Sequence, residues 1–544
     1  MGNVFQNRRI NSVYGILFQI PVFIIGAFGL YKLVEIFYYS LTKYDMLAAP
    51  TFVGFENFSN IFKTDVIQKC FDNTAFIVCA VAVLLILTAV LPALFIAKLK
   101  LPFGLGVMGA FSLISLCAML PNFFNCFFNG DRYGLINSML LSNSVINEPI
   151  LFAQDYAMML AVLILWLYCL APVFAITYIS ARMKHSFLGT AIAVCAIPVL
   201  MYSGGGIITG VVGFPSANYS ADWLYTIFHD YLMVRYEVGF AYAILIVGII
   251  MLIGWCLAVC LVTYGLWALC KNIRSDHLVC RVFGYITFAL SFLFFFAFLY
   301  YIIKYLLRAF MPVEELFIFP NHAYTPKNPT LDHFLHLFTS FTSWHNPIPD
   351  YVVNTLFVVP LKVIPVCFFV ALCSGVGFGA FHAFKRQKLL LLCFIPLLFV
   401  ADYTTFSKLG FINTYSVYAF EFLSSFEFLI AVFLVYLTTK LVFCNRDLRI
   451  SSVLVGSLFL MFSFYAIGVI RGIWHSSNAI LKEEIKTWGS FSAHYFSGSS
   501  IRSGVTTAND LLRLSTTLAV VIIPLALLLT LYLLYQKSSK NLTK

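Results

Sequence analysis

The side chains that could do chemistry in this chain are few, and most of them lie in or beside apolar stretches. Asn122 and Asn125 stand near the end of one such stretch, where their amides could bond a hydroxyl-rich solute or a neighbouring helix. Lys362, Glu421 and Glu427 lie in or near later apolar stretches. Because an ionisable group is costly in lipid, each is a candidate for the path of a transported solute, although Glu421 could also reach water from a helix end.

Other reactive residues match no known catalytic or metal site. The segment 311–351 is rich in histidine, but its spacing fits no ligand set for a metal ion, and we expect a solvated loop. A membrane-embedded transferase would need clustered carboxylates and histidines. The groupings of that kind are Glu314 and Glu315 with His322, and Glu483 and Glu484 with His494.

The sequence contains no motif for binding or hydrolysing a nucleotide. The sequence contains no G-x-x-x-x-G-K-[ST] phosphate loop, and no predicted cytoplasmic segment is long enough for a nucleotide-binding domain. The 14 cysteines fall mostly inside apolar runs without C-x-x-C pairs, which favours small buried side chains over disulfides or metal ligands. We therefore expect no enzyme activity, no cofactor and no metal on this chain, and any ATP must be hydrolysed by another subunit.

The composition indicates that this chain is embedded in a lipid bilayer. Of 544 residues, 61% are hydrophobic and only 10% are charged, whereas soluble domains carry about 25% charged residues. The mean hydropathy is +0.92. The net charge of +11 could suggest nucleic-acid binding in a soluble protein, but the basic residues cluster between apolar spans and read as topology signals. We expect no nucleic-acid partner.

Stretches long enough to cross the bilayer recur along the whole chain. The first follows Arg8 and Arg9 and is expected to be a retained helix. Basic clusters fall on the side of both termini and acidic residues mostly on the other, so both termini are predicted to be cytoplasmic, in the plasma or inner membrane. The twelve expected spans are 13–37, 74–98, 103–128, 156–181, 189–213, 239–268, 283–310, 352–382, 388–406, 417–442, 451–471 and 513–536.

The two halves of the sequence repeat short markers in the same order. F-V-G-F-E-N-F (52–58) precedes Asn73-Thr74, and N-P-T-L-D-H-F (328–334) precedes Asn354-Thr355. Later come Y-G-L-I-N-S (133–138) and L-G-F-I-N-T (409–414). We therefore predict an all-α polytopic membrane protein of two halves, 1–270 and 271–544, with six spans each in parallel orientation about a central path.

These markers resemble those of the maltose-type family of binding-protein-dependent ABC importer permeases. The first half is similar to one permease subunit, through F-V-G-F-E-N-F-S-N-I-F, F-N-G-D-R-Y-G-L-I-N-S-M-L (128–140) and V-G-F-A-Y-A (238–243). The second half is similar to the partner subunit, through N-P-T-L-D-H-F, V-V-N-T-L-F-V-V (352–359) and K-L-G-F-I-N-T-Y (408–415). The resemblance covers nearly the whole chain and implies a fusion of two type I permease halves.

The family signature that docks the ATPase is eroded in this sequence. It reads approximately E-A-A followed by Gly, in a cytoplasmic loop between helices four and five. Ile179 and His185 stand at the Glu and Gly positions of the first half, and Leu437 and Phe443 at those of the second. The resemblance therefore carries over only the location of the coupling loops, whose residues could equally be topology anchors: Tyr178, Ile179, Ala181, Arg182, Lys184, His185, Lys440, Arg446, Asp447 and Arg449.

The resemblance implies a permease that imports a sugar or oligosaccharide. An extracellular solute-binding lipoprotein would deliver the solute, and two ABC ATPase subunits would bind ATP beneath the membrane. Three alternatives stay open: a secondary carrier, a membrane-embedded transferase, and a degenerate permease that acts as a sensor or scaffold.

Overall fold

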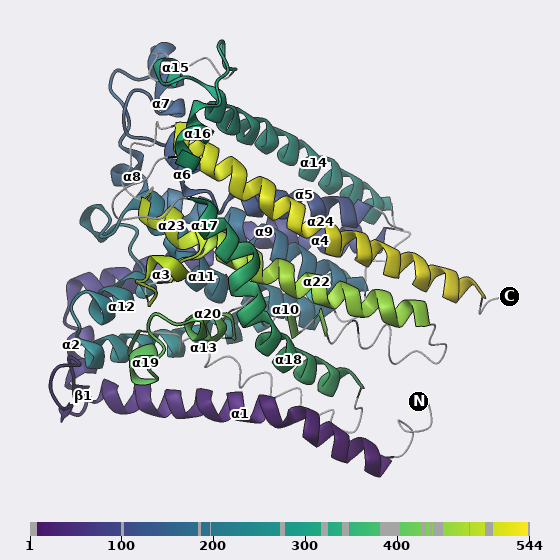
Figure 1. Cartoon of the computed structure of the whole chain (residues 1–544). Coiled ribbons are helices and arrows are strands. Elements are labelled where there is room, and N and C mark those ends of the chain that lie inside the picture. The colour runs from purple at the N-terminus through teal and green to yellow at the C-terminus, as the bar shows by residue number, and fades with distance from the viewer. Residues whose placement is uncertain are drawn as a thin grey trace. The chain divides into compact units, whose positions relative to one another are not determined.

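The structure is a computed structural model in which almost every described residue lies in a helix or in a turn between helices (Figure 1). One short hairpin occurs in the described part, where β1 (Thr42–Lys43) pairs antiparallel with β2 (Thr51–Phe52). The described residues are 8–99, 103–182, 186–195, 197–271, 278–316, 325–339, 348–380, 403–423, 425, 428, 431–432, 434–435, 438, 450–477, 479–495 and 504–541.

The chain divides into two compact units. Unit 1 comprises Met1–Glu35, Leu335–Ser497 and Leu511–Lys544, and unit 2 comprises Ile36–Phe334 and Gly498–Asp510. Each unit thus takes most of its residues from one predicted half but contains the first predicted span of the other. These two spans are α1 (Arg8–Ser40), most of which belongs to unit 1, and α14 (Leu278–Leu307), which belongs to unit 2.

Unit 2 is built around the apolar helix α9 (Ala157–Arg182). Phe111 and Phe174 are both buried and meet edge to face, with ring centroids 5.3 Å apart. The helices that pack on α9 are α3 (Asp65–Leu85), α4 (Leu91–Lys98), α5 (Phe103–Cys117), α10 (Ser186–Cys195) and α11 (Ile197–Val212).

A serine side chain of α5 hydrogen-bonds to backbone groups of α9 next to the internal proline of that helix. Ser115 of α5 donates its hydroxyl to the Leu167 carbonyl at 2.9 Å and accepts the Ala171 N–H at 3.2 Å. Pro172 follows directly and has no N–H to donate. The hydroxyl therefore satisfies backbone groups at a weak point of the helix and ties α5 to α9.

Smaller elements complete unit 2. The π-helical turn η1 (Ile86–Val90) joins α3 to α4, and α13 (Val238–Lys271) contacts α10 and α12. The remaining elements are α2 (Glu56–Ile61), α6 (Pro121–Phe127), α7 (Leu135–Ser142), α8 (Phe152–Asp155), η2 (Ala217–Tyr219), α12 (Leu224–Met233), η3 (Arg308–Phe310) and α15 (Val313–Leu316).

Unit 1 has its own core of aromatic and branched side chains. Phe406, Phe428 and Phe464 are buried there, and Phe368 meets Phe464 edge to face at 4.9 Å. α18 (Val359–Ala380) packs against α20 (Tyr415–Leu423) and α22 (Ile450–Trp474). The other elements are α16 (Asp332–Thr339), α17 (Ile348–Val353), η4 (Asn354–Val358), α19 (Tyr403–Lys408), η9 (Glu483–Ile485), α23 (Trp488–Tyr495) and α24 (Gly504–Asn541), of which α16 and α24 begin in unit 2.

Helix α1 is attached to unit 1 by one ion pair and one aromatic contact. Glu35 pairs with Lys408 as well as with Lys32 of its own helix. The ring of Phe28 meets that of Phe420 edge to face, with centroids 5.3 Å apart. The first helix of the chain is thereby joined to residues nearly 400 positions later in sequence.

Seven helices among the described residues are long and apolar enough to span a membrane, which is consistent with an all-α, multi-pass membrane protein. An eighth span is possible if α5 and α6 count as one, although the chain bends by 78° between Gly104–Cys117 and Pro121–Phe127. The expected span 388–406 lies mostly outside the described residues. The seven are Asp65–Ala97, Ala157–Ala181, Val238–Val262, Arg281–Phe310, Ile348–Cys373, Leu454–Trp474 and Gly504–Leu531.

Candidate functional site

The asparagine–threonine marker of the first half fixes a distant loop within unit 2. Asn73 Nδ2 donates to the carbonyl oxygens of Tyr219 and Asp222, each at 2.8 Å. The hydroxyl of Thr74 accepts the backbone N–H of Leu224, the first residue of α12, at 2.9 Å. The pair thus holds the start of α12 and the loop before it against α3.

The same marker in the second half makes the same set of bonds within unit 1. Asn354 Nδ2 donates to the carbonyl oxygens of Glu484 and Lys486, at 2.7 and 3.2 Å. The hydroxyl of Thr355 accepts the N–H of Trp488, the first residue of α23, at 2.8 Å. In both places the amide binds two carbonyls of the preceding loop and the hydroxyl binds the first N–H of the next helix. We call these two arrangements the asparagine latches.

Two glycines at helix starts also behave alike. Gly239 lies at the start of α13, and an added Cβ would come within 2.0 Å of the Thr42 carbonyl oxygen. Gly504 begins α24, where an added Cβ would come within 2.1 Å of His333 Nε2. Each glycine allows close approach to the segment that follows the first predicted span of its own half.

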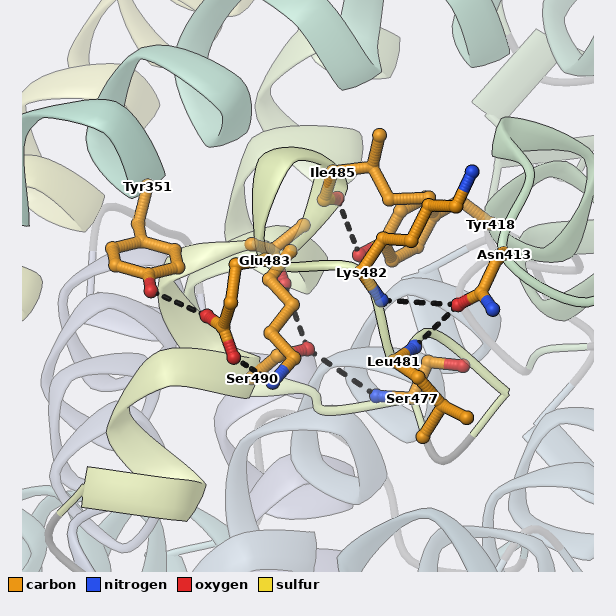
Figure 2. Close-up of polar contacts among 11 residues, drawn as sticks. Tyr351, Asn413, Tyr418, Ser477, Leu481, Lys482, Glu483, Ile485 and Ser490 are labelled. Carbon is orange, nitrogen blue, oxygen red and sulfur yellow. Dashed lines mark hydrogen bonds and ion pairs between the residues drawn. The ribbon is translucent and has the colours of Figure 1, made fainter. Parts of the chain in front are cut away.

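The second shared marker also holds a loop in each half. Asn413 Oδ1 accepts the N–H groups of Leu481 and Lys482, at 2.6 and 3.0 Å (Figure 2). In unit 2, Asn137 both donates to the Ile150 carbonyl and accepts its N–H, each at 3.0 Å. The markers therefore recur as loop anchors, although their hydrogen-bonding patterns differ.

The loop between α22 and α23 is anchored at several further points in Figure 2. The hydroxyl of Tyr351 donates to Glu483 at 2.5 Å, and that of Tyr418 donates to the Ile485 carbonyl at 2.9 Å. Glu483 also pairs with Lys486. These contacts give Glu483 a structural role in holding the loop.

A small, mainly apolar cavity with a few polar groups lies beside this loop in unit 1. Glu421 lines it and accepts a hydrogen bond from Ser477 Oγ at 2.5 Å, and Arg471 and His475 interact with Glu421 electrostatically. Tyr418 also lines the cavity. The space open to the centre of a water molecule is about 30 Å³, enough for about two waters, each needing roughly 10–15 Å³. The cavity as it stands is far too small for a sugar.

Lys362, another expected path residue of the second half, does not line this cavity. Lys362 lies on α18 with its ammonium 3.7 Å from the ring centroid of Tyr415, a cation–π contact. Glu427 lies outside the described residues.

The expected path residues of the first half lie at the bend between α5 and α6 in unit 2. Asn122 Nδ2 donates to Asp510 Oδ2 at 3.0 Å, and the hydroxyl of Tyr305 donates to the same oxygen at 2.7 Å. Asp510 is fully buried. Asn125 instead donates to the Gly210 carbonyl at 3.1 Å. One predicted residue thus belongs to a buried carboxylate site, which we call the Asp510 cluster, and the other holds α6 to α11.

The Asp510 cluster has the chemistry of a hydroxyl-binding site. A carboxylate, an amide and a phenol all bond well to the hydroxyl groups of a solute. Discontinuous membrane helices commonly line binding sites, because their backbone breaks only where it faces protein or a cavity. Phe123 of α6 also packs edge to face on Tyr305, with centroids 5.6 Å apart, and provides an aromatic surface beside the carboxylate.

The predicted coupling residues are described only in part. Tyr178 is buried, stacks on Phe174 at 5.9 Å and fills the space beside Gly104 of α5. Ile179 and Ala181 are partly exposed in the last turn of α9, and Arg182 ends that helix. The others lie outside the described residues: Lys184, His185, Lys440, Arg446, Asp447 and Arg449.

Two titratable residues of the loops also have structural partners. Glu315 accepts the backbone N–H groups of Lys327 and Asn328, each at 3.0 Å. His333 Nε2 lies 2.7 Å from the Met311 carbonyl oxygen. Groups of three or more potential metal ligands are absent from the described residues.

Sequence reasoning missed Asp510, Tyr305 and Arg513. The last span was expected to begin at 513, which placed Asp510 in an outer loop, but α24 begins at Gly504. Arg513 is also buried, and it donates to the Ile473 carbonyl at 2.8 Å and lies 4.3 Å from the ring centroid of Trp474. The usable signal was the helical spacing of polar residues before the apolar run, at 506, 510, 513 and 517.

Comparison of the chain with protein-family models, with curated proteins and with solved structures gives no match.

Proposed function

We propose that this chain is the membrane permease of an ABC-type importer for a sugar or oligosaccharide, with two six-span halves that arose by duplication. It would work with two ABC ATPase subunits and an extracellular solute-binding lipoprotein, in the plasma or inner membrane with both termini in the cytoplasm. The chain itself would bind no cofactor and catalyse no reaction. ATP would be bound and hydrolysed by the partner subunits.

The asparagine latches carry this proposal. The resemblance to a fused pair of permease subunits rests on markers that recur in each half, and two of those markers are Asn73-Thr74 and Asn354-Thr355. Their side chains bond the same kinds of backbone group in the same order. Chance similarity of two short strings does not account for matching roles of four side chains.

The Asp510 cluster is the proposed contact site for the solute. A buried carboxylate in a span is costly and therefore marks a functional position by default. In the described conformation Tyr305 and Asn122 occupy Asp510 Oδ2. Movement of the bent pair α5 and α6 would replace these donors with hydroxyl groups of the solute, so that solute binding and helix movement become coupled.

Solute binding to the purified chain in nanodiscs, with a panel of labelled oligosaccharides, tests this site. A hydrogen bond to a charged group contributes about 1.5–3 kcal/mol, so Asp510→Asn should weaken binding by roughly tenfold or more. Tyr305→Phe removes a donor that competes with the solute for Asp510 Oδ2 and should leave binding unchanged or tighter. Glu148→Gln changes an exposed carboxylate of an outer loop and serves as the matched control. Unchanged affinity in Asp510→Asn would remove this cluster from the solute path.

A secondary carrier coupled to a cation is the second candidate, and Asp510 is the observation that favours it. Carriers of this kind use a buried carboxylate to bind a proton or sodium ion. Uptake into proteoliposomes that depends on an imposed proton or sodium gradient, without ATP or any ATPase, would establish the carrier. Uptake that requires internal or external ATP with the ATPase subunits would establish the importer.

A further inference from the structure

Three cysteine side chains meet between α10 and α13 in unit 2. Cys195 is the last residue of α10, while Cys256 and Cys260 lie one turn apart on α13. Cys195 Sγ lies 4.0 Å from the Cys256 carbonyl oxygen, and the Cys195 thiol interacts electrostatically with the thiols of Cys256 and Cys260. The three cysteines are not in disulfides, and their side chains are partly exposed. Six of the other described cysteines are buried, so this cluster combines proximity with access.

The access is from an apolar surface. Ile253, Leu257 and Leu261 of α13 are 57%, 64% and 75% exposed, and they form a row at helical spacing next to the two cysteines of the same helix. In a candidate membrane span such a surface faces lipid. An oxidant dissolved in the hydrocarbon would therefore reach these thiols directly.

We propose that this cluster is an oxidation site, at which a lipid hydroperoxide converts Cys195 and either Cys256 or Cys260 into a reversible disulfide. One thiol loses its proton and attacks the hydroperoxide, whose O–O bond breaks to give a sulfenic acid and the lipid alcohol. The second thiol attacks that sulfur, forms the S–S bond and releases water. Two thiols are oxidised by two electrons, the hydroperoxide is reduced by two electrons, and a cellular thiol reverses the bond by exchange.

The disulfide would staple α10 to α13. Its two ends lie 61 residues apart for Cys195 and Cys256, and α10 lies within the segment 178–198 that is predicted to form the first coupling loop. If the proposed permease function holds, the staple would stop α10 from moving with that loop and would inhibit transport until the bond is reduced. The bond itself can be detected without any transport, so failure of the site and failure of the proposed function are distinguishable.

The test uses the full chain in nanodiscs, treated with cumene hydroperoxide and analysed by peptide mapping without reduction. We expect a peptide containing Cys195 linked to one containing Cys256 or Cys260, loss of two free thiols per chain, and recovery of both with dithiothreitol. Cys195→Ser should abolish the link, whereas Cys256→Ser should retain it through Cys260. Cys79→Ser, which removes an exposed thiol of α3, is the matched control and should change nothing at the cluster.

The wild-type map alone can overturn the proposal, whatever the stability of the variants. Oxidation that leaves Cys195 a free thiol, or links it mainly to another cysteine, would refute the site. Equal or faster linkage by hydrogen peroxide at the same concentration would refute access from the lipid side, because hydrogen peroxide stays mostly in water.

Discussion

Removal of one amide from an asparagine latch should cost the chain a defined amount of stability, and the same amount in each half. In Asn73→Ala the carbonyl oxygens of Tyr219 and Asp222 both lose their donor. A buried acceptor without a partner costs about 1–3 kcal/mol. The bond to Asp222 is buried and that to Tyr219 is part-buried, so the free energy of unfolding should fall by about 1–3 kcal/mol, mainly from the Asp222 acceptor. Asn354→Ala removes the donor of Glu484 and Lys486 and should lose a similar amount.

Unfolding by denaturant in mixed micelles, followed by tryptophan fluorescence, measures both losses. Asn143→Ala is the control, because the Asn143 amide bonds a carbonyl of its own helix at an exposed position, and a change of less than about 0.5 kcal/mol is expected there. Full loss in Asn73→Ala together with a control-sized loss in Asn354→Ala would refute the equivalence of the two latches.

Three further outcomes are expected. Gly239→Ala should lower the melting temperature and the yield of folded chain, because the added Cβ would lie 2.0 Å from a backbone oxygen. In the control Gly254→Ala the added Cβ meets nothing within 4 Å, so that variant should be neutral or stabilising. Equal melting temperatures and yields for the two variants would contradict this. Glu315→Gln removes one of two acceptor oxygens and should speed hydrogen exchange at residues 327 and 328; unchanged exchange there would show that the carboxylate does not hold the loop. Burial lowers the pKa of His229, and the nearby Asp230 carboxylate partly opposes this effect. The stability that neutral His229 contributes to α12 is therefore present above about pH 6.5, and it is lost as the pH falls toward the folded-state pKa. Hydrogen exchange in α12 should therefore rise between about pH 7.5 and 5.5, corrected for intrinsic rates, and His229→Asn should flatten the rise; the same rise in the variant would assign it to another group.

Apolar run length predicted several long helices of this chain, because hydrocarbon burial selects long apolar sequence directly. The expected span 239–268 corresponds to α13 and the span 283–310 to α14 and η3, with ends that differ by a few residues. Such spans need no knowledge of their neighbours. The twelve-span topology stays a prediction beyond the seven helices identified among the described residues.

The start of α24 could not be predicted in the same way. Thr506, Thr507, Asn509 and Asp510 are polar, and a hydropathy scale assigns them to water, yet all four are buried. They are buried because α24 meets other helices there, and Asp510 finds its donors on α6 and α14. Those donors lie more than 200 residues away in sequence, so only the folded chain brings the site together.

The break between α5 and α6 could not be predicted from apolar run length either. The stretch 103–128 reads as one apolar span, but Pro121 begins a new helix and the direction changes by 78°. A proline at a helix start and a proline within a helix look alike in sequence, as Pro172 inside α9 shows. The asparagines at this break were predicted to bond either a solute or a neighbour, and the structure gives both a protein partner.

The most direct test of the permease proposal is ATP turnover by the chain in nanodiscs with the ATPase that co-purifies from its native membrane. Solute presented with its binding protein should raise the rate of ATP hydrolysis, and Asp510→Asn should keep the basal rate while losing the stimulation. A chain that retains no ATPase and moves the solute only along an imposed ion gradient would contradict the account.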